Sequence, residues 1–179
     1  ALNLADANGL IVRSELEGAE DVALLAAFGG VDGAKGARAV DIGAEAVPVS
    51  EWWRFQPEHC RGNQITLDGA SFTLKAKAGA IGGFFSAGTT LSLGDAADWD
   101  RPGALLASAK PGCPLPVVFA RSPLAAKSPV YVVLKPLAEN RAADTGAPDF
   151  AAWFDAAETR RRAIAEPIVA DTPDALINA

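Results

Sequence analysis

Short segments of alternating apolar and polar residues occupy most of the first 137 positions, and they constrain the fold more than any other feature. Leu10, Val12 and Leu16 alternate with Ile11, Arg13 and Glu15, which suggests that the first set faces the core and the second a wetter surface. Val22, Leu24, Ala26 and Phe28 repeat the period of two. This period of two is typical of β-strands with one buried face. Shorter segments follow, separated by glycine and proline, at 64–77, 81–85, 89–93, 105–108, 117–120 and 130–134. The pattern predicts a mainly β fold, an antiparallel β-sandwich.

The clearest local feature is a hairpin over residues 64–77. Asp68-Gly69 separates two strand-like segments, and Asp-Gly is a pair that tight two-residue turns favour. In the second segment Phe72 and Leu74 face one way and Thr73 faces the other. We therefore expect Phe72 and Leu74 to lie in the core.

The periodicity changes after a polar, turn-forming stretch at residues 140–147. An amphipathic helix is predicted within residues 148–166, with its aromatic residues on one face and arginines near its end, where cations complement the helix dipole. Trp153 and Phe154 are expected to be buried, and Glu158 is spaced to pair with Arg162. The predicted domains are a sandwich, residues 1–139, and a linker helix with its continuation, residues 140–179.

The last residues have the pattern of a helix that is only beginning. Pro167 ends the predicted helix, and Asp171-Thr172-Pro173-Asp174 combines capping residues with a proline suited to a first turn. Apolar residues follow, and the sequence contains no Met. We therefore expect this chain to be a piece of a longer protein.

Charge and composition exclude some partners. The formal net charge is −6, and the only basic run is Arg160–Arg162, so no basic stripe for phosphate contacts is present and we expect no nucleic-acid partner. No apolar run is long enough for a membrane span. The two cysteines, Cys60 and Cys113, would form one disulfide in an oxidising compartment or remain two buried thiols.

Few catalytic patterns are present. His59 is the single histidine, there is no G-x-S-x-G motif, and the glycine-rich run after Gly29 lacks the Gly-Lys-Ser/Thr of a phosphate loop. Asp95, Asp98 and Asp100 fit turn chemistry, with calcium binding as the alternative. We predict no catalytic residue, no metal site and no cofactor.

Residues 29–63 form a long irregular arm with no strand pattern. Segments of this length are usually functional or pack on a neighbour. Trp52 and Trp53 would stack on sugar rings if exposed, or join the core if buried. Arg61 and Asn63 would hydrogen-bond a ligand or hold the arm in place. These four residues are the candidates for substrate binding.

Several segments together resemble a known family. They are DVALLAAFGGVDG, ARAVDIGAE, WRFQPEHCRGNQITLDGASFTL, GGFFSAGTTLSLGDA and the tail ETRRRAIAEPIVADTPDALINA. Their order and spacing resemble the N-terminal β-sandwich region of bacterial six-hairpin glycosidase-like proteins, the group that carries the DUF4450 domain. The resemblance implies a supersandwich-like fold whose linker helix leads to an (α/α)6 barrel beyond Ala179, with the chain after Asp171 matching the start of that barrel.

The resemblance also implies a function. The parent protein would be a glycoside hydrolase of carbohydrate metabolism, in a periplasmic or secreted location, with its catalytic acids in the barrel. This chain would be the non-catalytic sandwich that supports the barrel, and the 29–63 arm would reach the sugar cleft. Two alternatives stay open: an independent carbohydrate-binding module, and a purely structural or interaction sandwich. An exposed aromatic platform would favour the first, and an exposed apolar patch without a sugar-sized groove would favour the second.

Overall fold

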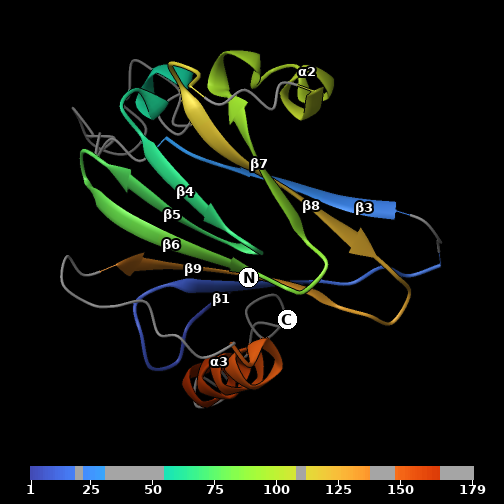
Figure 1. The fold of residues 1–179 in the computed structure, drawn as a ribbon. Coiled ribbons are helices and arrows are strands. Elements are labelled where there is room, and N and C mark those ends of the chain that lie inside the picture. Colours follow the sequence, from blue (N-terminus) through green and yellow to red (C-terminus); the bar gives the residue numbers. More distant parts are fainter. Residues whose placement is uncertain (19–21, 31–54, 108–111, 138–147, 166–179) are drawn as a thin grey trace, which may run out of the picture.

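The computed structural model describes residues 1–18, 22–30, 55–107, 112–137 and 148–165. These residues form two packed antiparallel sheets, with one long helix outside one sheet and short helices outside the other (Figure 1). The expected mainly β sandwich with a C-terminal helix is confirmed.

The larger sheet has six strands in the order β1-β2-β9-β6-β5-β4. Their bounds are β1 (Leu2–Asn3), β2 (Leu10–Ser14), β9 (Val130–Leu137), β6 (Gly79–Phe85), β5 (Ser71–Ala76) and β4 (Gln64–Asp68). The smaller sheet has the order β3-β8-β7, with β3 (Val22–Phe28), β8 (Pro116–Leu124) and β7 (Thr90–Asp95). All pairs within the two sheets are antiparallel.

The main core lies between the sheets. Phe72 and Leu74 of β5 face Val118 and Ala120 of β8, and all four side chains are buried. The alternation of β5 therefore points the predicted side chains inward. Gly83 of β6 allows this packing, because a Cβ there would lie 2.0 Å from the Phe72 ring.

The β4–β5 hairpin is confirmed, with its turn one residue later than the Asp-Gly pair suggests. Asp68 pairs with Ser71, so Gly69 and Ala70 form the two-residue turn. Gly69 has φ 55°, and Ala70 is not among the residues of positive φ. Glycine at the first turn position is the pattern of a type II′ turn, whose twist suits a hairpin.

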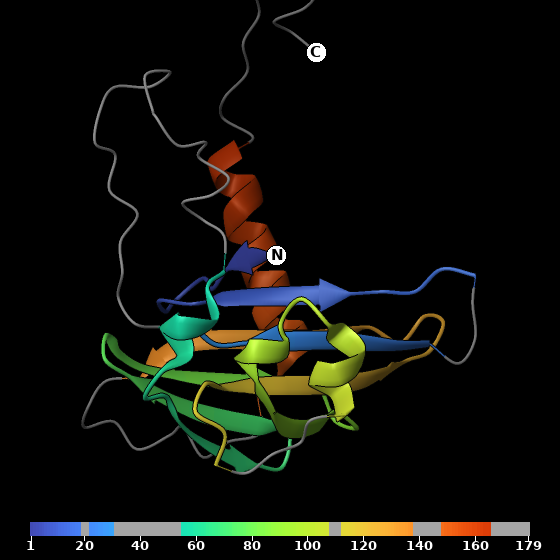
Figure 2. The same cartoon turned by 90° about the horizontal axis from the view of Figure 1, so that it is seen from above.

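Helix α3 (Phe150–Ala165) lies on the outer face of the six-stranded sheet. Its Ala157 is buried against Ile11 and Val133, which are fully buried. Trp153 and Phe154 pack at this contact but are half-buried, so the expectation of full burial is wrong. The reason is that a single helix covers only a stripe of the sheet, so the side chains at its flanks stay partly open. The last turns of α3 project beyond the sheet (Figure 2).

Short helices cover the outer face of the three-stranded sheet. They are η1 (Pro57–Cys60), η2 (Ala96–Asp98) and α2 (Pro102–Ala107), and we call them the cap. The strand predicted at 105–108 is wrong, since Leu105 belongs to α2. Pro102 suits the first position of a helix, and Leu105 packs so closely on β7 that a Cβ on Gly94 would lie 2.9 Å from its Cδ1.

Among the residues that the structure describes, no helix combines the length and the apolar character of a membrane span.

Candidate functional site

Two of the four substrate-binding candidates lie in the described residues. Trp52 and Trp53 fall outside them, as does most of the 29–63 arm. Arg61 and Asn63 follow η1 on the cap side of the molecule. Arg61 is exposed, and its backbone N–H donates to the Glu58 carbonyl at 3.0 Å.

Asn63 connects the cap to the sheet. Its Nδ2 donates to the Pro116 carbonyl at 3.2 Å, and its backbone N–H donates to the Cys60 carbonyl at 3.1 Å. The side chain is buried, and its Oδ1 has no hydrogen-bond partner among the residues that the structure describes. This geometry fits the structural alternative for Asn63, because a residue whose amide is committed to β8 holds the chain after η1 in place.

The two ends of the arm meet on the cap. A Cβ on Gly29 would lie 2.6 Å from Val117 Cγ1 and 2.9 Å from Cys60 Sγ. Gly30 has φ 77°, and a Cβ there would lie 2.8 Å from the Phe55 ring. Phe55 stacks on Trp99 with 3.8 Å between ring centroids. Gly30 and Phe55, two described residues of the arm that are 25 positions apart, are therefore brought together at one apolar cluster.

The acidic residues near η2 serve the turn. Asp95 Oδ1 accepts a hydrogen bond from the Ala97 N–H at 3.0 Å and caps η2, and Asp98 forms an ion pair with Arg101. Within the described residues, no group of three or more His, Cys, Asp or Glu side chains could hold a metal ion. These contacts fit the turn role expected for Asp95 and Asp98.

The two cysteines are not bonded to each other. Cys60 is fully buried in the cap. Cys113 is partly buried, and its thiol donates a hydrogen bond to the Gly94 carbonyl at 3.4 Å. The disulfide alternative is therefore not formed.

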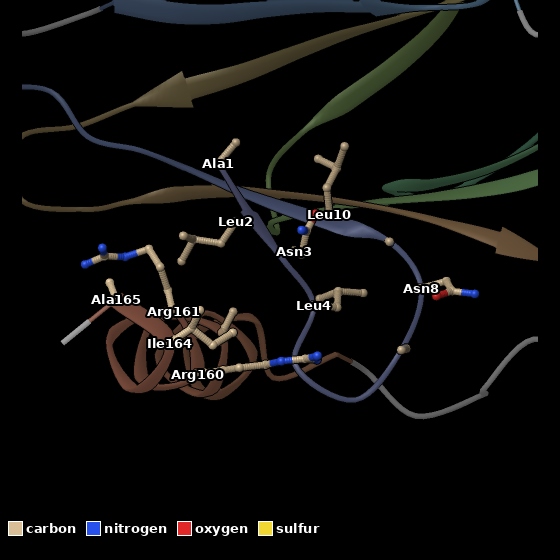
Figure 3. A pocket seen from close by; sticks show the side chains of 13 residues that line it. Ala1, Leu2, Asn3, Leu4, Asn8, Leu10, Arg160, Arg161, Ile164 and Ala165 are labelled. Atoms are coloured by element: carbon tan, nitrogen blue, oxygen red, sulfur yellow. The ribbon is translucent and has the colours of Figure 1, made fainter. Parts of the chain in front are cut away.

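A groove that the sequence did not reveal lies on the opposite side of the molecule. It runs between residues 1–10 and the last turns of α3, encloses about 830 Å³, and is called the N-terminal groove below (Figure 3). Leu2, Leu4, Leu10 and Ile164 supply much of its apolar lining, and Arg160 and Arg161 supply its positive charge. Ile164 is 62% exposed although it is a large apolar side chain.

The wall formed by the N-terminal residues is fixed from three directions. The β1–β2 pairing holds Leu2 opposite Ile11, and the Leu4 N–H donates to the Gly9 carbonyl at 3.1 Å. Gly9 has φ 146°, and a Cβ there would lie 2.6 Å from the Leu134 carbonyl oxygen, so only glycine lets the loop come this close to β9. On the other wall, an Arg160 N–H donates to the Ala5 carbonyl and ties α3 to the loop.

Glu158 holds the arginines beside the groove. It accepts two hydrogen bonds from Arg161, at 2.7 and 2.8 Å, and one from Arg162 at 3.0 Å, which confirms the predicted Glu158–Arg162 pair. The hydrogen bonds from Arg161 and then Arg162 lower the pKa of Glu158 to about 2. This shift favours the carboxylate, the opposite of what a general acid requires.

A second, smaller cavity of about 220 Å³ lies beside Leu4 and is lined in part by Asp6, Lys135 and Trp153. The Lys135 ammonium lies 5.0 Å from the centroid of the Phe84 ring and 5.7 Å from that of Trp153, within the range of cation–π attraction. We call it the Trp153 pocket. It brings together an aromatic ring, a cation and a carboxylate from three separate parts of the chain.

A family model covers most of the chain and fits this single sandwich with its attached helix. It matches residues 1–158, from β1 to the middle of α3, and its description is "Domain of unknown function (DUF4450)". The chain belongs to the DUF4450 family. No curated protein and no solved structure matches the DUF4450 chain significantly.

Proposed function

We propose that this DUF4450 chain is the non-catalytic sandwich of a glycoside hydrolase and supports a downstream (α/α)6 catalytic barrel. The observation that carries the proposal is the seating of α3. Ile11 and Val133 of the sheet are fully buried beneath it, and Ala157 of the helix is 3% exposed. A helix built into the core in this way moves with the sandwich, which is what a rigid support for a downstream domain requires.

The acids support a non-catalytic role. Glycoside hydrolysis ordinarily uses two carboxyl groups on either side of the bond, one of them kept protonated. Here Asp95 caps η2, Asp149 accepts from the Ala152 N–H at 3.0 Å at the start of α3, and Glu158 pairs with two arginines. Each of these three carboxylates is engaged by a structural partner, and the two arginines lower the pKa of Glu158.

The proposal is tested by comparing this chain with the longer protein it implies. We expect no turnover of aryl glycosides by the isolated chain, and turnover by a protein that carries the barrel. Deleting residues 1–149 from the longer protein should lower its stability or its activity. Turnover by the isolated chain that an Asp→Asn or Glu→Gln substitution abolishes would reject the non-catalytic role.

A second candidate function is carbohydrate binding by the sandwich itself, and the Trp153 pocket favours it. A half-buried tryptophan ring offers an apolar face to a sugar, while Asp6 and Lys135 offer an acceptor and a donor for hydroxyl groups. Titration of the chain with an oligosaccharide panel, followed by tryptophan fluorescence, tests this function. Asp6→Asn and Lys135→Gln should each weaken binding, and binding that survives both substitutions would place the sugar elsewhere.

A further inference from the structure

The N-terminal groove has a charge opposite to that of the protein. The chain as a whole carries a formal charge of −6, yet the described residues that line the groove include two arginines and no acidic residue. Its remaining lining is mainly apolar, from Leu2, Leu4, Leu10 and Ile164. A pocket that is mostly apolar with a few polar groups is typical of small-molecule sites, and about 830 Å³ lies in their usual range of roughly 300–1,000 Å³.

The groove is formed before any ligand binds. The Arg160 bond to the Ala5 carbonyl joins its two walls, and Leu4 and Ala157 at its base are 7% and 3% exposed. A site that does not have to be ordered on binding avoids an entropic cost. In Figure 3, Leu2 and Leu4 of the N-terminal segment lie on the side of the groove facing α3, which carries Ile164 and Arg160.

The two arginines are placed differently. A guanidinium has five N–H donors, and the bond to Ala5 uses one of those of Arg160. Arg161 is already held by Glu158 through two hydrogen bonds. Arg160 is therefore the stronger anchor for an anion, and Arg161 adds positive charge at the rim.

We infer that the N-terminal groove binds a small amphiphilic carboxylate. Its apolar chain lies on Leu2 and Ile164, and its carboxylate accepts hydrogen bonds from Arg160. Charge-assisted bonds between a guanidinium and a carboxylate fix the direction of the ligand, whereas the apolar lining provides affinity without strong selectivity for chain shape. This inference does not depend on the proposed function, because it concerns a surface of the sandwich alone.

The test compares ligands that share an apolar chain and differ in the sign of the head group. Decanoate and decyltrimethylammonium are titrated into the isolated chain by calorimetry, and the contact is located from backbone and arginine side-chain NMR shifts. We expect decanoate to bind at least about tenfold more tightly than the cation, with shifts at residues 2–10 and 157–165. Raising the salt concentration should reduce this preference.

Substitutions at three exposed residues distinguish the charged part of the site from its apolar part. Arg160→Gln should weaken decanoate binding roughly fivefold, the effect of losing one exposed charge pair, and should leave the cation unaffected. Arg162→Gln is the matched control, since Arg162 is on the same helix, contacts Glu158 and does not line the groove. Ile164→Ser should weaken both ligands equally. Melting temperatures near that of the unsubstituted chain verify that each variant is folded.

Several results would overturn the inference. Equal affinity for the two head groups would mean that the arginines do not select the ligand. An equal loss of decanoate binding in Arg160→Gln and Arg162→Gln would indicate a diffuse charge effect. NMR shifts confined to the Trp153 pocket, or no decanoate binding at millimolar concentration, would also reject the site.

Discussion

The two outer faces of the sandwich are covered in different ways. On the three-stranded sheet, the cap brings Cys60, Ala96, Leu105 and Val117 to 5% exposure or less. On the six-stranded sheet, α3 buries Ala157, but Trp153 and Phe154 stay half-buried and Ile164 is 62% exposed. One face is a closed core, and the other is a core that opens into a groove.

The difference follows from the shapes of the covering elements. A single straight helix contacts a twisted sheet along one stripe, so its flanks and its far end remain open. Three short turns can each approach the sheet separately and fill the gaps between one another. We therefore expect the cap face to contribute mainly to stability, and the helix face to provide the surfaces that bind other molecules.

The largest effect is expected in the cap. Leu105→Ala should lower the free energy of unfolding by about 2–5 kcal/mol, because it leaves a cavity between α2 and β7. Urea denaturation measures the change, and Ile164→Ala on the exposed end of α3 is the control, with an expected change under about 0.5 kcal/mol. Equal losses in the two variants would mean that the faces do not differ in this way.

A smaller effect is expected under α3. Trp153→Ala should lower the free energy of unfolding by roughly 2 kcal/mol, below the ~3–5 kcal/mol of a fully buried tryptophan, because part of its surface remains in water. Hydrogen exchange should show faster opening of α3 and unchanged protection of β8. A change near zero would indicate that the helix does not stabilise the sandwich.

Asn63 and Arg61 differ by burial although they are two positions apart. Asn63→Ala should lower the free energy of unfolding by about 1 kcal/mol, because the Pro116 carbonyl loses its donor. Arg61→Ala should leave stability nearly unchanged, since Arg61 is exposed. Chemical denaturation of both variants decides the point. If Arg61→Ala proved the more damaging, Arg61 would have a structural role that its exposure does not suggest.

The smallest effect concerns pH and the end of α3. Hydrogen bonds from Arg161 and Arg162 lower the pKa of Glu158 from 4.5 to about 2. A lowered folded-state pKa contributes stability above pH 4.5 that is lost as the pH falls towards 2. Helical circular dichroism over this range should decline less steeply in Glu158→Gln, and high salt should reduce the difference because the group is exposed. Identical profiles at low salt would contradict this ion pair in solution.

Much of the fold could be predicted because its signals are local. The apolar segment 22–28 predicted the bounds of β3, and the Asp68-Gly69 pair predicted the β4–β5 hairpin within one residue of its turn. The change to a helical period placed α3 inside 148–166. Each of these patterns reflects a side chain's orientation relative to its own strand or helix, and no distant partner is needed to read it.

Other features depend on distant partners. Alternation in 10–16 suggested that Leu10 and Val12 face the core, yet Ile11 between them is fully buried, because α3 covers the opposite face of β2. The segment 105–108 has a strand-like composition, yet Leu105 belongs to helix α2, which begins at Pro102. Leu105 packs against Gly94 of β7. Among the predicted site residues, Asn63 donates a hydrogen bond to the Pro116 carbonyl. The two residues are 53 positions apart, so no sequence pattern predicts this contact.

The sequence by itself determined the strands, the hairpin, the helix and the acidic character of the chain, since these depend on period, turn residues and charge. Only the tertiary structure decided which faces are closed. It placed the N-terminal strand against α3, 155 positions apart at the Ala5–Arg160 bond, and so created a groove whose apolar residues and arginines have no shared pattern in sequence. The physical reason is that a side chain is buried only when a second surface covers it. Here β1 and α3, from the two ends of the described chain, come together because both pack beside β2 and β9.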